Sequence, residues 1–155
     1  LHFYTVNTAK LSENVWKEAE KMLEQIQKYP QKEEYQKLVE ADRINLYERE
    51  AEKGDDRKFL EETDRVFKEN LRGDPAWKLY ERKLVYLESK QPDISGEFER
   101  FLKKYPKVMD AYVEYSIYLC RNNKMTQAQR VYREGRKQTG MTSKRAEELR
   151  RKLGL

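Results

Sequence analysis

The stretch AYVEYSIYLCRNNKMTQAQRVYREGRKQTG, residues 111–140, decides the fold. Its first half carries Tyr112, Tyr115 and Tyr118 at three-residue steps, a spacing that places them along one side of an α-helix. A short polar break follows, and the apolar pattern resumes in AQRVY before it stops at Gly140, a residue type that commonly ends helices. The stretch therefore predicts two helices joined by a short turn.

The same pattern recurs along all 155 residues. Charged residues make up 39% of the chain and apolar residues 37%, with only 6 Gly and 4 Pro, a balance typical of amphipathic helices with solvated outer faces. Apolar side chains recur at three- and four-residue steps, and Gly54, Gly73 and Gly140 end such runs, while Ser12 and Asp74 are expected to cap helices. The predicted fold class is all-α, with eight helices covering about residues 12–28, 32–53, 56–71, 74–87, 93–105, 107–122, 126–139 and 142–152.

Aromatic residues repeat at long intervals. Phe67, Phe98 and Tyr132 lie 31 and 34 residues apart, and Trp77-x-x-Tyr80 lies 35 residues before Tyr112-x-x-Tyr115. Self-similarity at this period predicts stacked pairs of helices, with the flat side chains filling the gaps between neighbouring helices rather than forming a ligand-binding aromatic box. The expected repeat-core anchors are Phe67, Trp77, Tyr80, Phe98, Tyr112, Tyr115 and Tyr132.

Three segments carry a resemblance to a known family. They are the trio Tyr112, Tyr115 and Tyr118, the segment AQRVY at residues 128–132, and the segment FERFL at residues 98–102 with its trailing Pro106. At these residues the chain resembles the half-a-TPR (HAT) repeats of RNA-processing factors, which are relatives of tetratricopeptide (TPR) repeats. The pattern departs from the family's at Leu84 or Leu119, which replaces a first-helix Glu, and at Gln129, which replaces an Arg.

The resemblance carries several expectations. It implies an α-solenoid of about three and a half TPR/HAT-like antiparallel hairpins, with a concave groove that holds an extended peptide or a helix from a protein partner. It also implies a scaffold within an RNA-processing complex and a nuclear location. The segment Tyr132-Arg133-Glu134-Gly135, followed by another helix, also resembles the helical domains of spindle-checkpoint kinases of the Bub family, so a checkpoint-type docking domain is an alternative.

We expect residues 1–155 to form a single repeat domain, because no linker interrupts the helical pattern. Residues 1–11 would be a lead-in, and residues 142–155 a capping helix or the start of the next repeat. The chain begins at Leu1 without an initiating Met, so we expect it to be a fragment of a larger protein.

Residues suited to catalysis or to binding cofactors are sparse. The one histidine is His2 at the very end of the chain, no glycine-rich phosphate loop is present, and paired acidic residues lie in polar runs at helix starts. We therefore expect no enzyme, no cofactor site and no metal site. A single cysteine fits a reducing, intracellular compartment, and no apolar run is long enough for a membrane span.

Positive charge gathers in the last third of the chain. Residues 1–100 contain 19 basic and 23 acidic residues, whereas residues 101–155 contain 14 basic and 5 acidic ones. The candidate contact residues for a partner or for RNA are Arg130, Arg133, Lys137, Lys144, Arg145, Arg150 and Arg151. Protein-partner binding is the leading expectation, with direct RNA binding, homodimerisation or a merely solvated face as alternatives.

Overall fold

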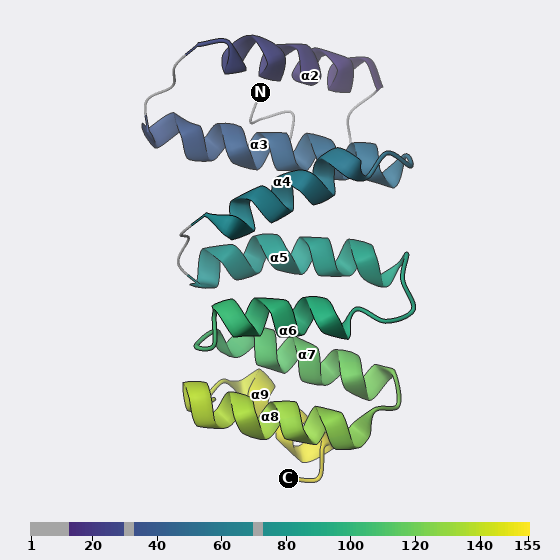
Figure 1. The fold of residues 1–155 in the computed structure, drawn as a ribbon, viewed down its shortest axis with the longest axis vertical. Helices are drawn as coiled ribbons and strands as arrows, with labels where there is room; N and C mark the ends of the chain where they lie inside the picture. The colour runs from purple at the N-terminus through teal and green to yellow at the C-terminus, as the bar shows by residue number, and fades with distance from the viewer. Residues whose placement is uncertain (1–12, 30–32, 70–72) are drawn as a thin grey trace. The chain divides into compact units, whose positions relative to one another are not determined.

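The computed structural model describes residues 13–29, 33–69 and 73–155, and these residues form eight α-helices and no strand (Figure 1). The predicted all-α fold class is thereby confirmed, and each helix lies within a few residues of its expected position. The helices are α2 (Glu13–Gln27), α3 (Glu33–Glu52), α4 (Arg57–Lys68), α5 (Gly73–Glu88), α6 (Ser95–Lys104), α7 (Met109–Arg121), α8 (Met125–Thr139) and α9 (Lys144–Lys152).

Two glycines end helices for a conformational reason. Gly54 follows α3 with φ of 114°, and Gly140 caps α8 with φ of 77°, a region of backbone space that side chains with a Cβ rarely enter. The Gly140 amide also donates a hydrogen bond of 2.9 Å to the carbonyl of Arg136, which closes the last turn of α8. These two glycines act as the stop signals that the sequence predicts.

Several predicted helix starts differ from the observed ones by one or two residues. Helix α5 begins one residue before its predicted cap, Asp74. Asp93 was expected to begin the fifth helix, but α6 begins at Ser95, because the Asp93 carboxylate accepts a hydrogen bond of 2.8 Å from the Ser95 amide in the preceding turn. The last helix was expected to begin at Thr142, but α9 begins at Lys144 with Ser143 as its cap. Ser12 and the lead-in at residues 1–11 lie outside the described residues.

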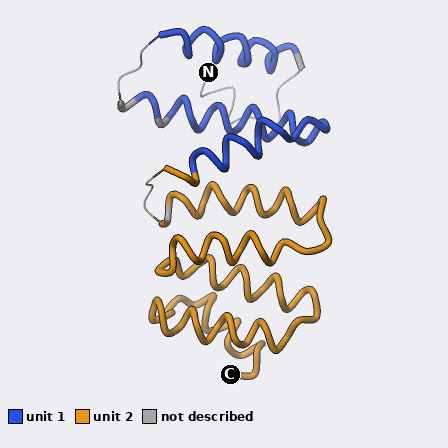
Figure 2. Tube along the Cα trace, in the orientation of Figure 1, with its two compact units in different colours: residues 1–66 blue, residues 67–155 orange. Residues whose placement is uncertain are grey.

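The chain divides into two compact units, residues 1–66 and residues 67–155 (Figure 2). The prediction of a single repeat domain stays a prediction, and the two units are described separately below.

In the first unit, α2 and α3 share an apolar core. Trp16, Ala19 and Leu23 of α2 pack with Leu46 of α3, and the partly buried Val39 lies against them. The apolar pattern of residues 32–53 groups Tyr35 and Leu38 with Ile44. In the structure, 50% and 45% of the surfaces of Tyr35 and Leu38 are exposed whereas Ile44 is buried, so that part of the prediction is wrong. The apolar residues of α3 are spread around the helix, and its core contacts come from the second half.

In the second unit, aromatic side chains connect successive helices. The ring of Tyr80 on α5 lies 5.1 Å from that of Phe101 on α6, and Phe98 on α6 stacks on Tyr115 of α7 at 4.8 Å. Phe67, at the end of α4, also contacts Tyr80, with ring centroids 4.7 Å apart. The fold of this unit is helical-repeat-like, since α5, α6 and α7 pack on one another through aromatic side chains.

Helices α7 and α8 pack especially closely at Gly135, which is buried. A Cβ atom added at Gly135 would lie 2.6 Å from both Cβ and Cγ of Tyr112. The two backbones can therefore approach at this level only because position 135 has no side chain. Helix α9 then covers the end of the pair, where the Tyr132 hydroxyl donates to the carbonyl of Ala146 at 3.1 Å.

Candidate binding surfaces

Three of the four basic residues of α8 form one exposed face. Arg130, Arg133 and Lys137 are spaced by three and four residues and lie opposite the buried Ala128 and Tyr132. Within the part of the chain that the structure describes, none of the three side chains makes a hydrogen bond or an ion pair. This face thus offers three cations to solvent without a local partner.

The basic residues of α9 do not form a single face. Arg145 pairs with Glu114 of α7, and Arg150 bonds to Glu147 at 2.9 Å and to the carbonyl of Leu155 at 3.0 Å. The other two predicted contact residues on this helix, Lys144 and Arg151, are exposed and lie seven residues apart, two helical turns along the same side of α9. The structure therefore groups three of the seven predicted contact residues on α8 and two on α9, and engages the remaining two in ion pairs.

The seven aromatic anchors lie inside the second unit. The exposed fraction of their surfaces is 6% or less in every case. Five of them contact neighbouring rings, as in the stacked pair Phe98 and Tyr115, and the Tyr132 hydroxyl donates to the carbonyl of Ala146. Their packing leaves no open aromatic box among them.

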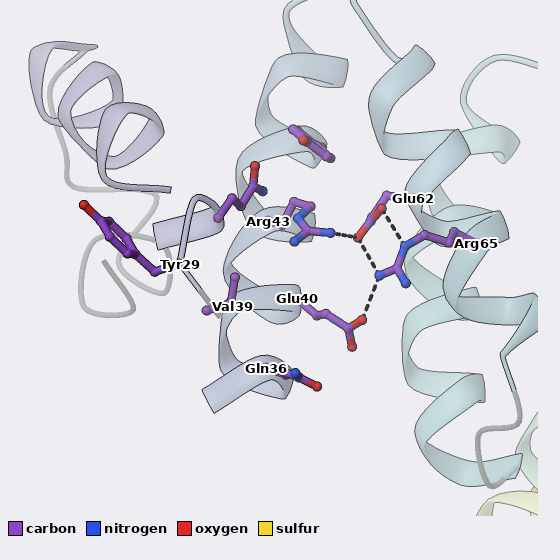
Figure 3. Close-up of a pocket in the computed structure, with 9 residues that line it drawn as sticks. Tyr29, Gln36, Val39, Glu40, Arg43, Glu62 and Arg65 are labelled. Carbon is purple, nitrogen blue, oxygen red and sulfur yellow. Dashed lines mark hydrogen bonds and ion pairs between the residues drawn. The ribbon is translucent and has the colours of Figure 1, made fainter. Parts of the chain in front are cut away.

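The first unit contains an open polar pocket of about 580 Å³ that the sequence did not predict (Figure 3). It is lined by the end of α2, by α3 and by α4. Arg43 of α3 contacts Glu62 of α4 at 2.9 Å, and Arg65 contacts both Glu62 at 2.9 Å and Glu40 at 2.7 Å. The four charged groups thus form a continuous chain of ion pairs along one wall of the pocket.

The charge of Glu62 is set by opposing effects. Burial raises the pKa of its carboxyl, but hydrogen bonds and charge from Arg65 and Arg43 more than offset burial, so the pKa lies below the ordinary value. Glu62 is therefore ionised at neutral pH, and the two carboxylates balance the two guanidinium groups. Such a wall can exchange hydrogen bonds with a polar ligand, but it presents no net charge.

Sequence reasoning missed this pocket because its residues come from three helices. Gln27 and Arg65, both in its lining, are 38 residues apart, and each occurs in a charged or polar run that reads as a solvated helix face. The available local signal was the pair Glu62 and Arg65, which are three residues apart on α4. That spacing occurs on many exposed helices, so it does not indicate a pocket.

The fold and these surfaces define a helical-repeat-like all-α protein. No protein-family model, no curated protein and no solved structure matches the chain. Across the described ranges 13–29, 33–69 and 73–155, no helix has the length and apolar character needed to cross a membrane. In those same residues no group of three or more His, Cys, Asp or Glu side chains is arranged to hold a metal ion.

Proposed function

We propose that this chain is a non-catalytic scaffold for protein–protein interaction. The observation that supports it is the helical-repeat-like packing of the second unit, in which the aromatic side chains of successive helices pack on one another. Because the large apolar side chains are used for internal packing, the outer helix faces are free to contact a partner. Stacked helix pairs expose such faces along their length, which suits an extended peptide or a helix from another protein.

Two parts of the proposal rest on the resemblance to HAT repeats alone. The first is a solenoid arrangement of the whole chain with a concave groove, and the second is a place in a nuclear RNA-processing complex. A fold can host many functions, so this part is an analogy between families. It is tested by the identity of the partners rather than by any feature of a single site.

The experiment that tests the scaffold is affinity capture from cell extract with two forms of the chain. One is the wild type, and the other carries Arg130→Glu, Arg133→Glu and Lys137→Glu. We expect both forms to retain the same protein partners, identified by mass spectrometry. The reason is that contacts in the proposed concave groove do not depend on the basic face of α8. Loss of every partner from the triple variant would place binding on that basic face and contradict the groove.

Direct RNA binding is the second candidate, and the three unpaired cations on α8 favour it. Each phosphate contact on a single strand contributes about −0.7 to the slope of log affinity against log salt. If RNA binds here, the triple variant should reduce the size of that slope for a labelled single-stranded RNA by about 2, measured by fluorescence anisotropy. A control variant with Lys17→Glu, Lys21→Glu and Arg57→Glu makes the same change in net charge on exposed residues of the first unit.

A further inference from the structure

A second depression lies in the second unit, between α7, the start of α8, and α9. Its volume is about 320 Å³, and its lining is mostly apolar. Its apolar lining residues, which we call the floor, are Ile117 and Cys120 of α7, Met125 at the start of α8 and Leu149 of α9, and we call its charged lining residues the rim. We call this depression the α7–α9 groove. Its volume is near the low end of the range for ligand sites, about 300 to 1,000 Å³, which suits one or two large side chains.

Met125 is an unusual feature of this floor. It is the first residue of α8, and 46% of its surface is exposed although it borders the half-buried Cys120 and Ile117. A flexible, polarisable thioether at the mouth of an apolar depression can adapt to different side chains. The floor therefore presents apolar surface that the chain itself does not cover.

The rim of the α7–α9 groove is basic. Arg121, Arg145 and Lys152 border it, against the single carboxylate of Glu148. Arg121 bonds to Glu88 at 2.9 and 3.0 Å, but 59% of the Arg121 side chain is exposed. Ion pairs this exposed contribute about 0 to 1 kcal/mol, so the guanidinium can turn to a partner's carboxylate at little cost.

Of the three cations, Lys152 has the simplest surroundings. Its side chain is exposed and makes no ion pair among the described residues. It lies on the same groove as Arg145, whose own partner, Glu114, stands on α7 outside the groove lining. The rim thus carries an excess of positive charge over an apolar floor.

We infer that the α7–α9 groove binds an acidic amphipathic segment of a protein partner. A leucine- or phenylalanine-sized side chain of that segment lies on Ile117, Met125 and Leu149, and its flanking Asp or Glu residues bind Arg121, Arg145 and Lys152. This inference rests on the proposed scaffold function and names one of its contact surfaces. RNA is the poorer fit, because none of the groove-lining residues is aromatic and a base has no ring on which to stack.

The first test is a fluorescence anisotropy titration with three labelled helical peptides. The probe has Leu at two positions one turn apart, Glu residues beside them, and Ala and Gln at the remaining positions so that it stays helical. One control replaces both Leu by Ala, and the other replaces Glu by Lys. We expect the probe to bind and both controls to bind at least about tenfold more weakly. Absence of binding by the probe, or equal binding by the Ala control, would overturn the inference.

Matched variants locate the binding. Lys152→Glu should lower the affinity for the probe by about tenfold, which corresponds to about 1.4 kcal/mol. Arg133→Glu makes the same charge change on α8 outside the groove and should leave the affinity within about twofold of the wild type. Met125→Glu should also lower the affinity for the probe, whereas Met22→Glu, at another exposed methionine, should leave it unchanged. Equal losses from the groove variants and their controls would show a nonspecific charge effect and overturn the inference.

Cys120 supplies an independent readout, because it is the only cysteine of the chain and lies on the groove floor. Bound probe should slow the alkylation of Cys120 by N-ethylmaleimide at pH 9, and the Ala control should not. The intact mass of the chain measures the extent of the reaction. Probe binding without protection of Cys120 would place the peptide elsewhere and overturn the inference. Protection by a single-stranded RNA instead of the probe would overturn it in favour of a nucleic-acid site.

Different results would contradict the α7–α9 groove inference and the scaffold proposal. If Lys152→Glu and Met125→Glu captured the same partners from extract as the wild type and the probe did not bind, the groove inference would fail while the scaffold stood. If the wild type captured no protein at all, the scaffold itself would fail.

Discussion

At the scale of single residues, the close approach of α7 and α8 depends on Gly135. A Cβ there would lie 2.6 Å from Tyr112, whose neighbouring atoms are themselves packed in the core. We expect Gly135→Ala to lower the free energy of unfolding by about 1 to 3 kcal/mol, the usual cost of overpacking. Urea unfolding followed by circular dichroism measures this effect.

Gly96 supplies the control for that substitution. It also lies in a helix, but a Cβ at Gly96 would meet nothing within 4 Å. Gly96→Ala should therefore leave the protein equally stable or up to about 1 kcal/mol more stable, because alanine favours the helix. Equal destabilisation by both substitutions would contradict the close approach of α7 and α8.

A second residue-scale prediction concerns Glu97 of α6, whose carboxylate contacts two residues of α5. The Tyr80 hydroxyl donates to its carboxylate at 2.6 Å, and the buried Lys83 ammonium lies 2.9 Å away. Burial raises the pKa of Glu97, but the bonds from Tyr80 and Lys83 outweigh burial, so the pKa is below its ordinary value of 4.5. We expect Glu97→Gln to lower the free energy of unfolding by about 1 to 3 kcal/mol at pH 7, because Lys83 loses its charged partner.

The pH dependence of that loss has a definite sign. A carboxyl whose pKa is lower in the folded state stabilises the protein above pH 4.5, and this contribution disappears as the pH falls through the folded-state pKa. The difference between wild type and Glu97→Gln should therefore be complete at pH 7 and shrink below pH 4.5. Glu18→Gln, on an exposed position of α2, is the control. A difference that stays constant down to pH 3 would show that Glu97 acts through packing alone.

At the scale of elements, α9 depends on its cap more than α6, α7 and α8 do. The Ser143 hydroxyl accepts a hydrogen bond of 3.2 Å from the Ala146 amide, whereas α6, α7 and α8 have no side-chain cap. We expect Ser143→Ala to destabilise α9 by about 1 kcal/mol. Faster hydrogen exchange of the α9 amides would report this, with Thr142→Ala as the control. Unchanged exchange in α9 would contradict the role of the cap.

The helices themselves were predictable because local signals mark their ends. Gly54 and Gly140 stop helices for a conformational reason that the sequence displays directly. Asp93 misled the prediction because a residue that caps helices can instead bond within the preceding turn, as its contact with the Ser95 amide shows. Tyr35 and Leu38 misled it because apolar residues without a single helical face do not reveal which of them are covered.

At the scale of the whole molecule, the binding surfaces were less predictable than the fold. The basic face of α8 follows from spacing within one helix, so Arg130, Arg133 and Lys137 could be grouped from the sequence. The polar pocket around Glu62 and the α7–α9 groove could not, because each is formed by residues from three helices whose contacts are set by tertiary packing.

The number of basic side chains available for binding was not predictable from the sequence either. The sequence shows an excess of basic residues in its last third, but it does not show that Arg145 and Arg150 pair with Glu114 and Glu147. The pairing reduces the number of cations free to contact phosphate.

The central claim is that this chain holds protein partners without help from nucleic acid. The most direct measurement is affinity capture of the wild-type chain from extract, with and without nuclease, followed by quantitative mass spectrometry. The account predicts that the same partners are retained in both samples in similar amounts. Partners that disappear after nuclease treatment would contradict it and would make RNA binding the primary function.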